Sequence, residues 1–184
     1  MVSLSNRLGF MMDGRAVRRY HTAHVLDHQR IDAHSWGVAM VIMLLLPDET
    51  MRRAALIEAA LVHDLAEQQW GDIPAPTKRA LPTEMRSRLS QLEDDELAAN
   101  GFHVNLTTAE KRLLKIADAA DGALHCIVER RMGNAMVTSV FQNFWTYLTE
   151  EQAIGELVVD TQVAEQELKE CIQMAWMRAA GVTV

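Results

Sequence analysis

Apolar residues recur at intervals of three and four along almost the whole chain, and runs that alternate apolar and polar residues are absent. The first spacing places apolar side chains on one face of an α-helix, whereas alternation would indicate a half-buried strand. The pattern therefore predicts an all-α protein. No repeat, linker or low-complexity segment interrupts it, so we expect residues 1–184 to form a single domain with one sizeable core.

Residues that start or stop helices divide the first half of the chain. We expect a helix over residues 3–12, an irregular segment over 15–32 and a second helix over 33–46. A third helix begins after Thr50, which can cap it, and carries His63, Asp64 and Glu67. The prolines within residues 71–76 cannot continue a helix, so the third helix should end before them.

The second half of the chain contains clearer capping signals. A fourth helix is predicted over residues 83–100, with Gly101 as its stop. Thr107 and Glu110 form a capping box for a long fifth helix through Arg131. The remaining expected signals are Asn134 at the start of a sixth helix and Thr149 with Gln152 as the cap of a seventh, which reaches Ala180.

Composition and charge narrow the functional class. The chain is 49% hydrophobic and 23% charged, as in ordinary globular proteins, and its net charge of −7 argues against a broad nucleic-acid surface. Its longest apolar stretch, residues 36–46, is too short to span a bilayer, and residues 1–7 lack the apolar core of a signal peptide. Cys126 and Cys171 are far apart among helix formers, which favours free thiols. We therefore expect a cytoplasmic protein without nucleic-acid or membrane partners.

The adjacent pair His63-Asp64 is the clearest chemical signal, because it lies in an apolar helical run. Burying an unpaired imidazole or carboxylate costs several kcal/mol, so a partner should hold both groups. A divalent cation suits both ligand types. His34 upstream and Asp118 downstream are further candidate ligands, each on its own predicted helix.

On the fifth predicted helix, Lys111, Lys115 and Asp118 share a face, at spacings of four and three. Two ammonium groups and a carboxylate directed into one space suit a site that holds a metal and a phosphate together. The alternative is purely structural, with His63 and Asp64 stabilising the fold and Lys115 pairing with Asp118 on the surface. The complete order of four ligand types, each on a helix, favours the metal site.

The order His34, His63-Asp64, Asp118 resembles the signature of HD-domain phosphohydrolases. Residues 63–78 are similar to a segment of bacterial 5′-deoxynucleotidases, which have an HD pair, a Glu three residues after its Asp, and then Gly-Asp-Leu/Ile-Pro-x-Pro-x-Lys. The segments 18–20, 33–35 and 114–119 also resemble those enzymes. The resemblance implies an HD-domain helical bundle. It also implies one divalent transition metal per subunit (zinc, cobalt or manganese), with ligands His34, His63, Asp64 and Asp118.

The chain also resembles the small phage-encoded dATP triphosphohydrolases, which are HD proteins of similar length. Those enzymes have an Arg-aromatic pair before the first ligand, a proline in the loop after the HD helix, and lysines that face the triphosphate. The positions here that match these substrate-binding roles are Arg19, Tyr20, Pro76, Lys78 and Lys115. Tyr20 stands where tryptophan is usual, and Thr22 stands where a bulkier apolar residue is expected.

Two acidic residues are candidates for proton transfer. Glu67 is four residues after His63, so on a continuous helix it would lie beside the metal, where it could orient water or accept its proton. Asp72 is a second candidate, near the leaving oxygen.

Three functions compete. The first is a dATP or dNTP triphosphohydrolase that releases deoxynucleoside and triphosphate. The second is a 5′-deoxynucleotidase acting on monophosphates, and the third is a non-catalytic HD domain that senses nucleotides. The intact ligand set with Glu67 argues against the third, and three candidate phosphate-binding cations favour the first. Similar enzymes form dimers or hexamers, which implies a homo-oligomer that acts in the cytoplasm (the host cytoplasm if the protein is phage-encoded).

Overall fold

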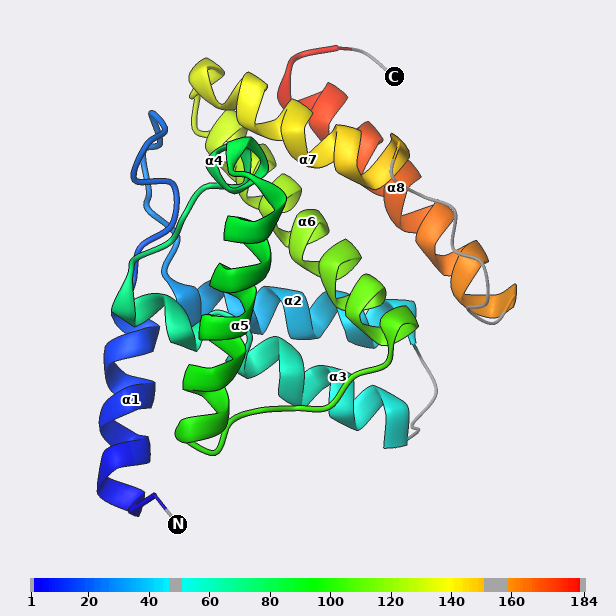
Figure 1. The fold of residues 1–184 in the computed structure, drawn as a ribbon. Helices are drawn as coiled ribbons and strands as arrows, with labels where there is room; N and C mark the ends of the chain where they lie inside the picture. Colours follow the sequence, from blue (N-terminus) through cyan, green and yellow to red (C-terminus); the bar gives the residue numbers. More distant parts are fainter. Residues whose placement is uncertain (1, 47–50, 151–158, 183–184) are drawn as a thin grey trace.

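The computed structural model describes residues 2–46, 51–150 and 159–182, and it confirms the all-α prediction (Figure 1). The elements are α1 (Leu4–Ala16), α2 (Ile31–Leu45), α3 (Met51–Val62), η1 (Leu65–Gln69), α4 (Ala75–Ala80), α5 (Thr83–Ala99), α6 (Thr108–Arg131), η2 (Ala135–Val137), α7 (Thr138–Glu150) and α8 (Val159–Ala179), of which η1 and η2 are 3₁₀ helices. Within these residues there is no strand, only an isolated backbone bridge between Arg18 and Arg30. Among the described helices, none is long and apolar enough to cross a membrane.

Helix α6 is the central element of the bundle. It packs against α2 and α3 on one side and against α7 and α8 on the other. Figure 1 shows α7 and α8 side by side at one edge of the molecule and α1 at the opposite edge. Leu113, Ile116 and Ala120 of α6 are fully or almost fully buried in the main core with Val38 and Ile42 of α2. Because α6 is buried over much of its length, Asp121 and Glu129 on it are buried, whereas Lys111 and Lys115 are exposed.

Helix α1 extends four residues beyond its predicted end at residue 12. It packs against η1, and Phe10, Leu65, Ala66 and Leu97 form a second, smaller core cluster. Gly14 stays inside this helix, where it allows close approach: a Cβ atom there would lie 2.7 Å from a side-chain carbon of Leu65. The glycine therefore serves packing between two elements and does not stop the helix.

The prediction that a single helix carries His63, Asp64 and Glu67 is wrong. Helix α3 ends at Val62, His63 and Asp64 form a turn, and Glu67 lies in the 3₁₀ helix η1. The expected cap, Thr50, lies outside the described residues. The third helix does end before the prolines of residues 71–76, but helical structure resumes at them, because Pro74 and Pro76 lie at the start of α4, where the missing N–H groups have no helical partner to lose.

The C-terminal half follows its capping signals more closely. The Thr107–Glu110 capping box is present at the start of α6, and Gly101 after α5 has a φ of 73°, a conformation that favours glycine. Asn134 caps η2, which leads directly into α7. Thr149, however, does not cap a helix: it lies in the last turn of α7 and its hydroxyl donates to the carbonyl of Trp145. Its expected partner Gln152 lies outside the described residues.

Candidate active site

The four expected metal ligands converge where α2, the turn after α3, and α6 meet. Ligand atoms of His34, His63 and Asp118 all lie within 4.8 Å of one another. Asp64 joins this group through its two oxygens, which lie 3.5 Å from Nε2 of His34 and 3.2 Å from Nε2 of His63. His34 is completely buried, so the convergence occurs at the inner end of the site.

Hydrogen bonds at Nδ1 determine which nitrogen of each histidine can bind a metal. Nδ1 of His34 lies 2.7 Å from Oδ2 of Asp121, and Nδ1 of His63 lies 2.8 Å from the carbonyl oxygen of Ala60. Both partners are acceptors, so Nδ1 carries the proton in each ring. Both Nε2 atoms are buried and lack a hydrogen-bond partner in the described residues. Two unpartnered imidazole nitrogens beside two carboxylates fit a divalent transition metal.

The electrostatics of the same group reflect its concentrated charge. Burial and Arg19 oppose protonation of His34, but Asp118 and Asp121 outweigh them and raise its pKa to about 9. Burial alone would raise the pKa of Asp118, yet the imidazole of His34, 3.1 Å away, and the charge of Arg19 lower it. The pKa of Asp64 is likewise lowered by His63 and His34 against the effect of burial. The carboxylates are therefore ionised, and a bound metal would replace the proton on His34.

Asp121 is a site residue that the sequence analysis missed. It lies one turn after Asp118 on α6, and it also accepts a hydrogen bond from Nε2 of Gln29 at 2.8 Å. Its approach to α2 depends on Gly37, where a Cβ atom would lie 1.8 Å from Oδ1 of Asp121. The spacing of three from Asp118 was the available signal, because it places both carboxylates on one face of the helix.

Glu67 is buried beside the metal ligands although it is not on the helix of His63. One oxygen lies 3.7 Å from the ammonium of Lys78, and the other, Oε2, is buried without a hydrogen-bond partner. Burial and the nearby charges of Asp64 and Asp72 raise the pKa of Glu67 to about 9. Lys78 also contacts Glu93 of α5 at 3.2 Å. Lys78 therefore lies between Glu67, next to the expected metal ligands, and Glu93 of α5.

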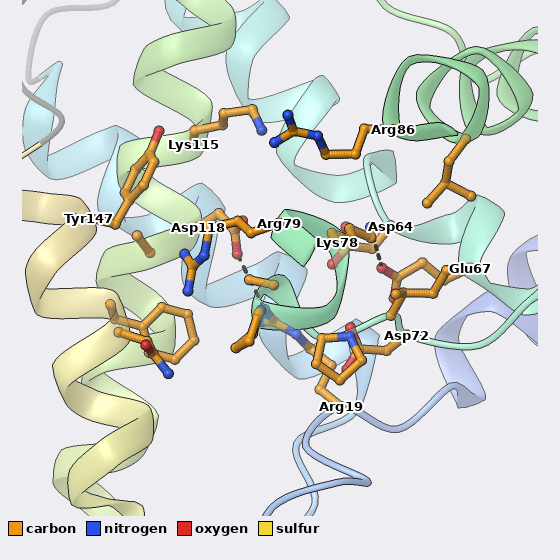
Figure 2. Close-up of a pocket in the computed structure, with 18 of the residues that line it drawn as sticks. Arg19, Asp64, Glu67, Asp72, Lys78, Arg79, Arg86, Lys115, Asp118 and Tyr147 are labelled. Carbon is orange, nitrogen blue, oxygen red and sulfur yellow. Dashed lines mark hydrogen bonds and ion pairs between the residues drawn. The ribbon is translucent and has the colours of Figure 1, made fainter. Parts of the chain in front are cut away.

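A cavity of about 900 Å³ opens from this centre (Figure 2). Asp64 and Asp118 line it, so the ligand group is accessible from the cavity. This volume is ample for a small-molecule substrate. The charged residues that line it are Arg19, Asp64, Glu67, Asp72, Lys78, Arg79, Arg86, Glu93, Lys115 and Asp118. They come from the loop after α1, η1, the following loop, α4, α5 and α6.

The sequence profile of the family described as 5′-deoxynucleotidase YfbR-like matches residues 8–160. The chain belongs to the YfbR-like 5′-deoxynucleotidase family. No curated protein sequence matches it significantly.

Several solved structures, two of them described as HD-domain phosphohydrolases, share the fold of this YfbR-like chain. One from Listeria innocua is 18% identical with a TM-score of 0.70, and the match covers 96% of this chain and 93% of that chain. The cyanophage S-2L HD phosphohydrolase DatZ, solved with dA and one catalytic Zn²⁺ ion, is 20% identical with a TM-score of 0.65, covering 95% and 98%. The PH0347 protein from Pyrococcus horikoshii is 18% identical with a TM-score of 0.65, covering 94% and 99%. At these identities, the likeness establishes the HD-domain fold.

The remaining expected residues of this YfbR-like protein also line the cavity, namely Arg19, Tyr20, Asp72, Pro76, Lys78 and Lys115. Arg19 is almost buried and lies 3.3 Å from Oδ1 of Asp118. The ring of Tyr20 stacks on His125 with centroids 4.8 Å apart, and its buried hydroxyl has no hydrogen-bond partner in the described chain. Tyr20 also has a φ of 63°, the only positive value at a non-glycine residue among the described residues. Such backbone strain persists where surrounding contacts hold it.

Sequence reasoning missed several residues that the YfbR-like fold brings to the cavity. Arg79 follows Lys78 on the unpredicted helix α4, and Arg86 and Glu93 lie on α5. Asn143 and Tyr147 of α7 also line it, one turn apart. The α5 residues had a signal in their spacing of seven, which returns to one helix face. The α7 residues had none, because nothing local indicates which helix closes the cavity.

Proposed function

We propose that this protein is a metal-dependent deoxynucleotide phosphohydrolase that converts dATP or a related dNTP to deoxynucleoside and triphosphate. The observation that carries the proposal is the pair of buried, unpartnered Nε2 atoms beside two aspartates, opening into a cavity lined by cations. A phosphohydrolase needs this combination of a metal centre for the reacting phosphoryl group and positive charge for the rest of the phosphate chain.

His34, His63, Asp64 and Asp118 would hold one divalent transition metal (zinc, cobalt or manganese). When bound, the metal polarises the phosphoryl oxygen and lowers the pKa of water. The Zn²⁺ ion in the cyanophage neighbour supports this choice of ligand chemistry. Asp121 and the Ala60 carbonyl keep both Nε2 atoms directed at the site through their hydrogen bonds to Nδ1.

We assign proton transfer to Glu67 and Asp72. The positive charge of a bound metal would oppose the effect of Asp64 on the pKa of Glu67 and favour its ionised form. Oε2 of Glu67, buried and without a partner in the described residues, would then accept a hydrogen bond from the attacking water and take its proton. The water oxygen bonds to the α-phosphorus as the bond from phosphorus to O5′ breaks, and O5′ then needs a proton. Burial raises the pKa of Asp72, with a further contribution from Asp64. This favours the protonated carboxyl, which can donate to O5′.

The other cavity residues bind the nucleotide. Arg19, buried against Asp118, faces the reacting phosphate, and Lys78 and Lys115 offset the charge of the phosphate chain. Tyr20 and Pro76, at the same cavity, contact the base and sugar. The cyanophage neighbour bound to dA supports a deoxyadenosine ligand.

A monophosphate is the second candidate substrate, because the matching family is described as 5′-deoxynucleotidase. The same ligands and Glu67 would serve that reaction, with deoxynucleoside and orthophosphate as products. The two functions differ in whether further phosphates must be bound beyond the one at the metal: a triphosphate has them and a monophosphate does not.

Product analysis separates the candidates. The metal-loaded protein is incubated with each dNTP and dNMP, and products are identified by chromatography. We expect deoxyadenosine and triphosphate from dATP, and Asp64→Asn should abolish both turnover and metal binding while retaining helix content. Release of orthophosphate from dNMPs alone would support the monophosphatase. Metal binding without turnover of any nucleotide would support the non-catalytic sensor.

We also propose that the protein acts as a homo-oligomer, dimer or hexamer, in the cytoplasm and without nucleic-acid or membrane partners. Exposed apolar side chains on α2 and α6, Trp36, Leu44, Leu124 and Val128 among them, support self-association. Light scattering of the metal-loaded protein measures the subunit number, and a monomer at all concentrations would contradict this part of the proposal.

A further inference from the structure

The cationic side chains that line the cavity fall into two groups. Arg19 contacts Asp118, and Lys78 contacts Glu67 and Glu93, so both are neutralised by neighbouring carboxylates. The other group, Arg79, Arg86 and Lys115, is exposed and has no acidic partner in the part of the chain that the structure describes. We call these three residues the cationic rim.

The cationic rim is assembled from three helices. Arg79 comes from α4, Arg86 from the first turns of α5 and Lys115 from α6. In Figure 2, Arg86 and Lys115 point toward each other from opposite helices at the same edge of the cavity. Like charges directed at each other repel, and an anion between them would remove that cost.

Neighbouring polar groups support an anion at this edge. Nη2 of Arg86 donates to Oγ1 of Thr83 at 3.2 Å, which restrains the guanidinium beside the cavity. Ser87 and Ser90 of α5 also line the cavity. With Thr83 and Arg86, they follow the spacing of one helix face, so hydroxyl donors accompany the charges.

We propose that the cationic rim binds the distal phosphates of a nucleoside triphosphate and that Arg79 and Arg86 determine the preference for triphosphates. This rests on the proposed function, since the metal centre must hold the reacting phosphate. The phosphate next to the sugar lies at the ligand aspartates, and the phosphates beyond it extend to the rim. A monophosphate has no group that reaches these residues.

Binding of inorganic phosphates tests the rim without turnover. Affinities of the metal-loaded protein for tripolyphosphate and orthophosphate are measured at a fixed excess of free metal. Arg79→Ala and Arg86→Ala should each weaken tripolyphosphate binding about 5- to 10-fold. A loss of this size lies between the contribution of an exposed ion pair and that of a charge-assisted hydrogen bond. Orthophosphate binding should change less than twofold.

Two variants serve as controls. Arg88→Ala removes an exposed arginine of the same helix that does not line the cavity, so both affinities should stay at their wild-type values. Arg86→Lys keeps the charge and should retain most of the tripolyphosphate affinity. The proposed role of the cationic rim would be overturned if Arg79→Ala and Arg86→Ala both kept the wild-type affinity for tripolyphosphate. Equal losses of affinity for tripolyphosphate and orthophosphate would also overturn it.

The test of the cationic rim and the test of the proposed function can give different results. If tripolyphosphate binding depends on Arg79 and Arg86 but dATP is not hydrolysed, the proposed triphosphohydrolase activity is contradicted, while the cationic rim is supported as a polyphosphate-binding site. If dATP yields deoxyadenosine and triphosphate with an unchanged KM in both alanine variants, the proposed role of the cationic rim is contradicted, while the proposed function is supported.

Discussion

The two histidines of the candidate metal centre donate from Nδ1 to different acceptors, a carboxylate for His34 and a backbone carbonyl for His63. The first arrangement places two acidic groups around His34 and makes its proton difficult to remove. The second leaves His63 without such a carboxylate at Nδ1. At the scale of single residues, His34 should therefore control how metal binding depends on pH.

Metal affinity should rise with pH up to about 9, where the raised pKa of His34 lies. Below that value, the imidazolium must lose its proton before Nε2 can bind a metal. We expect the affinity to tighten by up to about tenfold per pH unit between pH 6.5 and 8.5, as for release of one proton. Calorimetry in buffers of different ionisation enthalpy measures that release. A flat affinity without proton release would contradict the assignment of His34.

The raised pKa of His34 also affects the stability of the metal-free protein. This stability should fall as pH rises, whereas metal affinity should increase. Because the folded state holds the His34 proton more tightly than the unfolded chain, this stabilisation is complete below the unfolded pKa of about 6.5. It is lost as pH rises through about 9.

Glu67 should act on the nucleophile and not hold the metal. Its Oε2 is buried and unpartnered, whereas its other oxygen faces Lys78. Glu67→Gln should lower kcat by about 10²- to 10⁴-fold, the usual size for a lost acid-base group. Metal content, measured by atomic emission, should remain stoichiometric. A variant with normal kcat would assign the proton to another group, with Asp72 the next candidate.

The helices around the cavity contribute cations that differ in whether a carboxylate is paired with them. Lys78 of α4 is held by Glu67 and Glu93, whereas Lys115 of α6 is exposed at the cavity edge. The helix on which a lysine lies should therefore decide whether its loss affects every substrate or only those with a long phosphate chain.

Lys115→Ala should weaken kcat/KM for dATP by about 10- to 150-fold, as expected for a charge-assisted contact, and should barely affect residual turnover of dAMP. Lys78→Ala should reduce turnover of both substrates, because it also removes the ion pair of Glu67. Lys111→Ala is the matched control, since Lys111 lies one turn before Lys115 on α6, is exposed and does not line the cavity. Equal losses on dATP and dAMP in Lys115→Ala would favour the monophosphatase.

The end of α6 fixes the loop that supplies Arg19 and Tyr20. The fully buried carboxylate of Glu129 accepts hydrogen bonds from the backbone N–H groups of Leu26 and Asp27, at 2.7 and 2.8 Å, and from Nδ2 of Asn134. Burial alone would raise the pKa of Glu129, but these donors lower it. The loop is therefore held by an ionised carboxylate.

Glu129→Gln should lower the free energy of unfolding by about 1–3 kcal/mol, because the amide can accept from fewer of the three donors. Urea denaturation measures this, with the exposed Glu167→Gln of α8 as the control. The stabilisation is present above the unfolded pKa of about 4.3 and is lost as pH falls through the lower folded value. The difference between variant and wild type should therefore shrink below pH 4, and a constant difference would contradict the charged role.

Across the whole bundle, the candidate metal centre would join α2, the turn after α3, and α6. A ligand that binds only the folded state stabilises it in proportion to the logarithm of its concentration relative to Kd. Metal should therefore raise the Tm of the entire bundle in one cooperative transition.

Thermal unfolding with and without saturating Zn²⁺ tests this coupling. The wild type and the exposed control Asp95→Asn should both show a higher Tm with metal, whereas Asp64→Asn should show none of this increase. A concentration of metal about 100 times Kd corresponds to about 2.7 kcal/mol of stabilisation. An equal rise in Tm for Asp64→Asn would place the metal elsewhere.

Features that depend on neighbours a few residues away can be predicted from the sequence alone. Helical spacing fixed the all-α class, and the capping box of Thr107 and Glu110 marked the start of α6, because both arise from free energies within one or two turns. The sequence also indicated His34, His63, Asp64 and Asp118 as one group, because a metal restricts its ligands to few residue types, and the structure brings these four side chains together.

Contacts between distant parts of the chain, by contrast, depend on the assembled fold and could not be predicted from the sequence. Asp121 reaches His34 across 87 positions, Glu129 reaches Leu26 across 103, and the end of α3 at Val62 depends on how η1 packs against α1 and α5. The grouping of Arg79, Arg86 and Lys115 is of the same kind. No local preference encodes these contacts, because their free energy comes from packing that exists only when the helices are assembled.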